Sequence, residues 1–136
     1  KNLFFKPKPR LEFGHKSISY TSSSIDSSDG LSSCLNELSS QSQKKFLITK
    51  IPTNNDVREF SEKNNTSLNR LVFDGGEEFE LVFTVTPKNL KKIHALGKKN
   101  KISIFEIGQV SKGKGVFFDD GNNLFKIKDN GWQHFR

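Results

Sequence analysis

One polar stretch sets the fold of this chain: Ser24-Ile25-Asp26-Ser27-Ser28-Asp29-Gly30-Leu31. It combines two carboxylates, three hydroxyls and a glycine, and an apolar segment follows it directly. Apolar residues there recur at i, i+3, i+4 and i+7, the spacing of one buried helix face: Leu31, Cys34, Leu35 and Leu38. We therefore expect a helix over residues 28–42, with Ser28 or Asp29 as its N-terminal cap.

The residues before this stretch predict a strand. Residues 17–21 alternate polar and apolar side chains, so Asp26 would lie where a strand ends and a helix begins. At such a junction Asp26 and Asp29 can hold Mg²⁺ through oxygen ligands, while Ser28 and unpaired N–H groups can receive a phosphate. The alternative is a polar turn that only caps the helix and binds nothing.

Composition narrows the class of protein. The chain has 136 residues, enough for one domain, and a formal net charge of +7, which raises the question of nucleic acid or anionic membranes. The lysines are scattered in pairs such as Lys44-Lys45 and Lys98-Lys99, without interleaved stacking aromatics, so we expect no nucleic-acid binding. The single cysteine allows no disulfide, and no apolar run reaches membrane-spanning length, so we expect a cytoplasmic protein without a membrane segment.

The start of the chain suggests that it continues beyond these residues. Methionine occurs nowhere, including position 1, so we expect a piece of a longer protein whose site is shared with other residues. The basic first ten residues contain Pro7 and Pro9, which disfavour helix and indicate an extended connector. An open alternative is that Lys6, Lys8 or Arg10 contacts an anionic ligand.

A second notable stretch lies in the middle of the chain: Phe73-Asp74-Gly75-Gly76-Glu77-Glu78-Phe79-Glu80-Leu81. Its paired glycines precede an alternating strand over residues 79–85 and allow close approach of a ligand to the backbone. Glu77 and Glu78 are therefore candidates to hold a cation or to hydrogen-bond a ligand. The alternative is a glycine turn followed by exposed glutamates.

The remaining pattern alternates strands and helices. We expect further strands at residues 46–52 and 102–107, and a hairpin of 116–118 with 124–128. Helices are expected at residues 53–64, 68–72 and 86–97, with His94 at the surface, and a loop at 108–115. This order predicts an α/β (α+β) domain with a mixed sheet covered by helices. Near the end of the chain, Trp132 is interpreted either as part of a core plug or as a stacking platform.

Three stretches together resemble the C-terminal half of thiamine-monophosphate kinase, in the superfamily of aminoimidazole ribonucleotide synthetase: residues 26–31, residues 75–81 and Gly131-Trp132-Gln133-His134-Phe135. Their order and spacing match along essentially the whole chain, and Pro7-Lys8-Pro9-Arg10-Leu11 resembles the arm that enters this half. The resemblance implies a connecting arm at residues 1–16, a missing N-terminal half before it, and a C-terminal α/β domain at 17–136.

The resemblance also implies a function. It implies a cytoplasmic kinase that transfers phosphate from ATP to thiamine monophosphate, yielding thiamine diphosphate, with Mg²⁺ as cofactor. Asp26 and Asp29 would be metal ligands, Ser28 would contact ATP, and Glu77 and Trp132 would bind thiamine monophosphate. In the family the missing half supplies most of the nucleotide ligands and the homodimer interface, so these residues alone are expected to be inactive.

Two departures and two alternatives accompany this interpretation. Glu78 and Phe79 stand where the family often has aspartate and tyrosine. The chain could instead belong to another ATP-using member of the same superfamily, or be a non-catalytic phosphate-binding module.

Overall fold

The computed structural model describes residues 9–53, 55–76 and 80–130. The elements follow one another as α2 (Leu11–Ser17), β1 (Thr21–Ser27), α3 (Leu31–Ser42), β2 (Lys44–Ile48), α4 (Asn55–Lys63), α5 (Leu68–Asp74), β3 (Glu80–Val85), a 3₁₀ turn η1 (Pro87–Asn89), α6 (Leu90–Lys99), β4 (Gly108–Lys112), β5 (Gly115–Asp119) and β6 (Leu124–Ile127). None of the helices in this part of the chain is long and apolar enough to cross a bilayer.

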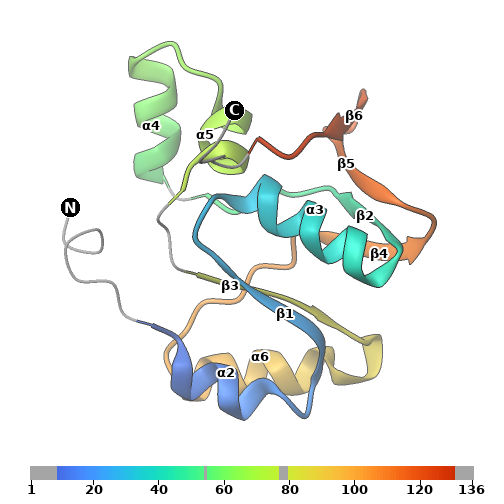
Figure 1. Cartoon of the computed structure of the whole chain (residues 1–136). Coiled ribbons are helices and arrows are strands. Elements are labelled where there is room, and N and C mark those ends of the chain that lie inside the picture. The colour runs from blue at the N-terminus through green and yellow to red at the C-terminus, as the bar shows by residue number, and fades with distance from the viewer. Residues whose placement is uncertain (1–8, 54, 77–79, 131–136) are drawn as a thin grey trace.

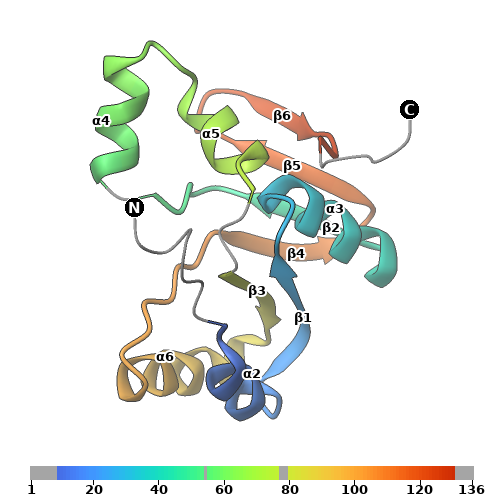
Figure 2. The same cartoon turned by 60° about the vertical axis from the view of Figure 1, so that its left-hand side comes forward.

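The strands described form two sheets. β1 and β3 pair antiparallel as a ribbon, and a second sheet has the order β4-β2-β5-β6. In that sheet β2 is parallel to β5 and antiparallel to β4, so the predicted mixed sheet is confirmed. Figures 1 and 2 show α2 and α6 together at one end of the domain, with the β1–β3 ribbon between them and the larger sheet.

The core lies between α3 and the four-stranded sheet. α3 contacts β1, β2, β5 and α5, and its predicted apolar face is buried. Phe73 of α5 meets Phe118 of β5 edge to face, with 5.5 Å between ring centroids. The cluster of buried side chains is Leu31, Leu35, Leu38, Phe46, Ile48, Val72, Phe73, Val116 and Phe118. Burial of one stripe of α3 against the sheet therefore holds this half of the domain together.

Most of the predicted elements are present with shifted ends. α4, α5 and α6 correspond to the predicted helices, and β5 with β6 forms the predicted hairpin. In the hairpin turn, Asp119 accepts a hydrogen bond from the Gly121 N–H, and Asp120 accepts from the Asn122 and Asn123 N–H groups. These two aspartates serve the turn, as their position next to a glycine indicates.

The start of α3 differs from the prediction. The helix begins at Leu31, three residues later than expected, with Gly30 as N-cap and no capping side chain among the described residues. Gly30 has φ +103°, and a Cβ there would lie 2.9 Å from the Gly75 carbonyl oxygen. β1 extends to Ser27 instead, because pairing with β3 holds these residues extended. The prediction that Ser28 or Asp29 caps the helix is therefore wrong.

The prediction of a strand at residues 17–21 is wrong. Residues 17–21 do not form a strand of the described structure, because Leu11–Ser17 is helical and β1 begins at Thr21. The missed helix α2 buries Phe13 and Ser17, and the Ser17 hydroxyl donates to the Gly14 carbonyl over 2.9 Å. Serine is a polar residue, so Ser17 does not extend the apolar pattern of the helix although it is buried. The sequence therefore gave little indication of α2. Residues 11–16 of the expected arm are thus helical and pack on α6.

Near β4, the structure has a strand where we expected a loop, and it has no strand where we expected one. Residues 102–107, expected as a strand, form no helix or strand in the described structure, and β4 follows at residues expected as a loop. The Ile107 carbonyl accepts hydrogen bonds from the N–H groups of Thr49 and Lys50. β4 is exposed along its whole length and exists by pairing with β2. An exposed edge strand lacks the apolar period that would reveal it in the sequence.

The contact of Gly30 with Gly75 can be tested by substitution. Gly121→Ala is the matched control, since φ is +92° there and no described atom lies within 4 Å of an added Cβ. Gly121→Ala should cost about 1–2 kcal/mol through its backbone conformation alone. Gly30→Ala should cost roughly 1–3 kcal/mol more through overpacking against the Gly75 carbonyl. Chemical denaturation of both variants measures the difference, and equal losses would contradict the contact.

The buried thiol offers a second test of the fold. Cys34 is 4% exposed, and burial raises the pKa of its thiol, so less of it is thiolate at pH 8 than in a free cysteine. We expect iodoacetamide to label Cys34 only when the chain unfolds. Mass spectrometry of native and guanidine-treated samples measures the labelling. Equally fast labelling in both samples would show that α3 does not cover this residue.

Candidate functional site

The two polar stretches singled out in the sequence meet in the fold. A Cβ added at Gly76 would lie 3.1 Å from the Ser28 carbonyl oxygen and 3.8 Å from the Asp29 Cα. A Cβ added at Gly30, next to Asp29, would lie 3.1 Å from the carbonyl oxygen of Phe73. The backbones of both turns therefore touch, and glycine at these positions permits the approach. Residues nearly fifty positions apart in the sequence thus form one surface.

Two carboxylates stand at this junction. Asp26 is the penultimate residue of β1, Asp29 lies in the turn before α3, and both side chains are exposed. Among the described ion pairs, none involves either of them. Neither carboxylate has a counter-charge in the described structure, and a bound cation would supply one. Carboxylate oxygens are ligands of Mg²⁺, so the residues present fit this metal.

The two carboxylates alone would not complete a metal site. Within the described ranges, there is no group of three or more histidine, cysteine, aspartate or glutamate side chains placed to hold a metal ion. Mg²⁺ requires six oxygen ligands and commonly keeps waters and substrate phosphates among them. The remaining ligands would therefore come from water, from a phosphorylated substrate or from residues outside the described ranges.

The N-terminus of α3 faces the same turn. In the described structure no side chain caps this helix, so its first-turn N–H groups lack a capping partner. Ser28, half-buried, lies in the turn just before it, and the buried hydroxyls of Ser27 and Ser32 have no hydrogen-bond partner among the described residues. A helix N-terminus with free donors is suited to bind a phosphate group.

Cys34 supports this turn but is not a nucleophile. Its Sγ donates to the Asp26 carbonyl oxygen over 3.3 Å, which joins α3 to the end of β1. Burial raises the pKa of the thiol, and the nearby Asp26 carboxylate raises it further. A neutral, buried thiol is inert. The expectation that Cys34 is buried on the apolar helix face is confirmed.

Two of the expected site residues, Glu77 and Trp132, lie outside the described residues, as do Glu78 and Phe79. The described residues beside these segments form contacts that the sequence did not predict. Asn130 donates a side-chain hydrogen bond to Asp74 over 3.2 Å, at the end of α5. Arg10 forms an ion pair with Glu80, the first residue of β3. Both pairs join residues far apart in the sequence, so no local pattern could have revealed them.

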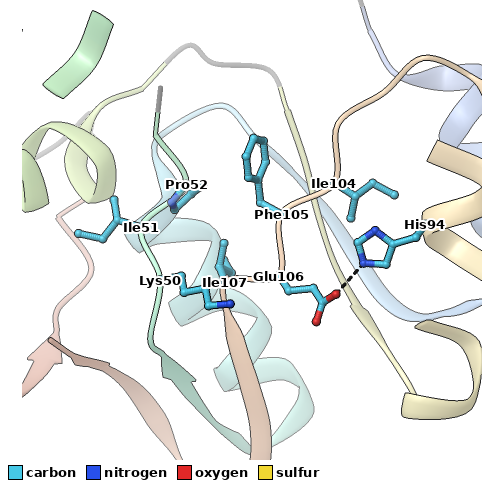
Figure 3. A pocket seen from close by; sticks show the side chains of 8 residues that line it. All are labelled: Lys50, Ile51, Pro52, His94, Ile104, Phe105, Glu106 and Ile107. Atoms are coloured by element: carbon cyan, nitrogen blue, oxygen red, sulfur yellow. Dashed lines mark hydrogen bonds and ion pairs between the residues drawn. The ribbon is translucent and has the colours of Figure 1, made fainter. Parts of the chain in front are cut away.

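A separate pocket lies between the end of β2, α6 and the segment before β4 (Figure 3). In it the His94 Nε2 and the Glu106 Oε1 are 2.7 Å apart. His94 is partly exposed at the surface, as predicted. The lining residues are Lys50, Ile51, Pro52, His94, Ile104, Phe105, Glu106 and Ile107, which include none of the residues expected to bind metal, ATP or substrate.

Comparison with known proteins gives the family context. No protein-family model matches the chain. A curated thiamine-monophosphate kinase of Nitrosopumilus maritimus is 49% identical over 130 residues, which cover 96% of this chain and 41% of that protein. A second, from Pyrococcus horikoshii, is 34% identical over 132 residues and is covered over 39% of its length. The chain therefore spans about two fifths of the length of the curated relatives it matches.

The solved structures that resemble this chain include a protein that points to the same family as the curated relatives. The structure of AaThiL complexed with AMPPCP and TMP superposes with a TM-score of 0.77 at 30% identity, covering 96% of this chain and 39% of that one. The hydrogenase maturation protein HypE of E. coli superposes with a TM-score of 0.71 at 16% identity, which is a likeness of fold alone. The expected aminoimidazole ribonucleotide synthetase-like architecture is thereby confirmed. With its two polar turns in contact and this similarity along 96% of its length, the chain is a homologue of the C-terminal half of thiamine-monophosphate kinases.

Proposed function

We propose that the chain is the C-terminal part of an ATP-dependent kinase that phosphorylates thiamine monophosphate to thiamine diphosphate. The observation that carries the proposal is the contact of the turn at residues 28–30 with Gly75 and Gly76. It brings together the same two stretches that resemble this family. The relative AaThiL was solved with AMPPCP, an ATP analogue, and TMP, which supports ATP and thiamine monophosphate as the two substrates.

The exposed carboxylates serve the metal in this proposal. Asp26 and Asp29 hold Mg²⁺, which supplies neutralisation of the charge that develops on the transferred phosphoryl group. The two residues come from a strand end and a turn whose backbones are fixed by β3 and by Gly76. Residues fixed in this way would hold the metal, and with it the phosphates of the substrates, in one orientation. Phosphoryl transfer needs such positioning more than it needs a covalent nucleophile.

ATP and thiamine monophosphate contact different residues in this proposal. Ser28 and the uncapped N-terminus of α3 contact the phosphates of ATP, because donors at a helix start attract negative charge. Glu77 and Trp132 bind thiamine monophosphate, whose cationic thiazolium ring suits a carboxylate and an aromatic face. Gly76 precedes Glu77 directly and lies against the turn of Ser28 and Asp29, which supports a substrate position beside the metal.

The rest of the site belongs to other parts of the protein. The chain covers 41% of the length of the Nitrosopumilus relative, and two carboxylates leave most Mg²⁺ and nucleotide ligands to be supplied. We propose that an N-terminal half supplies them, that the whole protein is a cytoplasmic homodimer, and that it binds no nucleic acid. Another ATP-using member of the superfamily stays a second candidate, because the shared fold also occurs in HypE.

The proposal can be tested on the full-length protein. Incubation with MgATP and thiamine monophosphate should yield thiamine diphosphate, quantified by chromatography, and removal of Mg²⁺ with EDTA should abolish it. Asp29→Asn and Glu77→Gln should each lower kcat/KM by about 100-fold, because each removes a charged contact to the metal or to the substrate in the proposed site. Asp56→Asn, an exposed carboxylate on α4, is the matched control and should leave the rate unchanged.

The outcomes separate the candidates. Product formation that is lost in both variants but kept in the control supports the kinase. ATP consumption without thiamine diphosphate, seen only with other substrates of the superfamily, would contradict the assignment and favour the second candidate.

The incompleteness of the site leads to a separate prediction. A protein of residues 1–136 alone should form no thiamine diphosphate, because Asp26 and Asp29 provide too few ligands to hold Mg²⁺ and ATP together. The same assay, with the full-length protein as positive control, measures this. Turnover by residues 1–136 above the background of ATP with buffer would show that the site is complete in this part.

A further inference from the structure

The ion pair between Arg10 and Glu80 has a geometry that only arginine can form. Arg10 Nε donates to Glu80 Oε2 over 3.1 Å, and Arg10 Nη2 donates to Glu80 Oε1 over 2.7 Å. Both oxygens of the carboxylate are thus engaged by one planar guanidinium, which fixes direction as well as distance. The side chains are 31% and 49% exposed, so water screens the pair and it contributes little to stability. The main effect of the pair is to fix the position of the Arg10 side chain relative to Glu80.

One end of the pair lies at the candidate site. Glu80 is the first residue of β3 and pairs with Ser27, while the next residue, Leu81, pairs with Asp26. On the other side of residues 77–79, Gly76 lies against the backbone of Ser28 and Asp29. The described residues before and after this segment are therefore both held by the turn that carries the two carboxylates.

The other end lies where the chain enters the domain. Arg10 follows the two prolines of the expected arm, and its carbonyl accepts a hydrogen bond from the Gly14 N–H over 2.7 Å at the start of α2. In the proposed function an N-terminal half precedes this domain, and it would connect to the domain through this end of the described chain. The guanidinium thus joins the entering chain to the first residue of β3.

We propose that Arg10 is a positioning residue for phosphoryl transfer: through its bidentate contact with Glu80 it sets the N-terminal half of the protein relative to Asp26 and Asp29. The inference rests on the proposed function, in which groups from both halves surround ATP and Mg²⁺. Displacement of reacting groups by about 1 Å can cost 100-fold in rate. The pair also holds the Glu80 carboxylate in one position at the start of β3.

The test uses the full-length protein and separates kcat from KM. Arg10→Gln should lower kcat about 10-fold while the KM values for ATP and thiamine monophosphate change less than about 3-fold, since orientation and not substrate contact is lost. Arg10→Lys should be intermediate, because an ammonium cannot engage both oxygens. Arg10→Glu combined with Glu80→Arg should recover activity relative to either single change. Lys16→Gln, which removes the ion pair of Lys16 with Glu12, is the matched control and should not change kcat.

Each outcome decides the inference. A kcat for Arg10→Gln equal to that of the unsubstituted protein would overturn it, and so would a loss that the charge exchange fails to relieve in a folded double variant. Trypsin provides a readout independent of activity, because the ion pair shields Arg10. Cleavage after Arg10 should be faster in Glu80→Gln than in the unsubstituted protein, and an unchanged rate would overturn the inference. Absence of thiamine diphosphate from the unsubstituted protein would contradict the proposed function and with it the role in phosphoryl transfer, whereas the cleavage rates would still show whether the pair holds Arg10 in place.

Discussion

The structure depends on the backbone contact between the turn at residues 28–30 and the glycines at 75 and 76. Gly30 approaches the Gly75 carbonyl, and Gly76 approaches the Ser28 carbonyl, at separations that leave no room for a further side chain. This contact joins the end of β1 and the start of α3 to the end of α5. It also exposes two carboxylates without a described counter-charge on one surface. The fold and the candidate site therefore share one constraint.

Helix α3 contributes both to the core and to the candidate site. Its apolar stripe packs on the four-stranded sheet and forms most of the core with α5 and β5. Its uncapped N-terminus ends at the polar turn, where free donors suit an anion. The thiol of Cys34 connects the two roles, because it is buried in the helix and bonds the Asp26 carbonyl. This hydrogen bond joins α3 to the strand end that carries Asp26.

The fold alone does not determine the chemistry of this domain. HypE shares it at 16% identity, and functions differ among proteins of one fold because the residues of the site differ. The present chain combines paired aspartates with a Gly-Gly-Glu stretch, and it is 49% identical to a thiamine-monophosphate kinase over 130 residues. The surroundings of the turn add contacts particular to the folded chain, such as Asp74 with Asn130 and Arg10 with Glu80.

The sequence by itself determined the features that follow from local patterns of residues. The period of Leu31, Cys34, Leu35 and Leu38 predicted the buried face of α3, the acidic glycine turn predicted the β5–β6 hairpin, and the polar motifs predicted the family. Only the tertiary structure decided that residues 102–107 do not form a strand, that exposed β4 does, and that α3 starts at Leu31. The reason is physical: periodicity reports which face of a segment is buried, whereas strand pairing, close backbone contacts and the Arg10–Glu80 pair depend on partners far away in the chain.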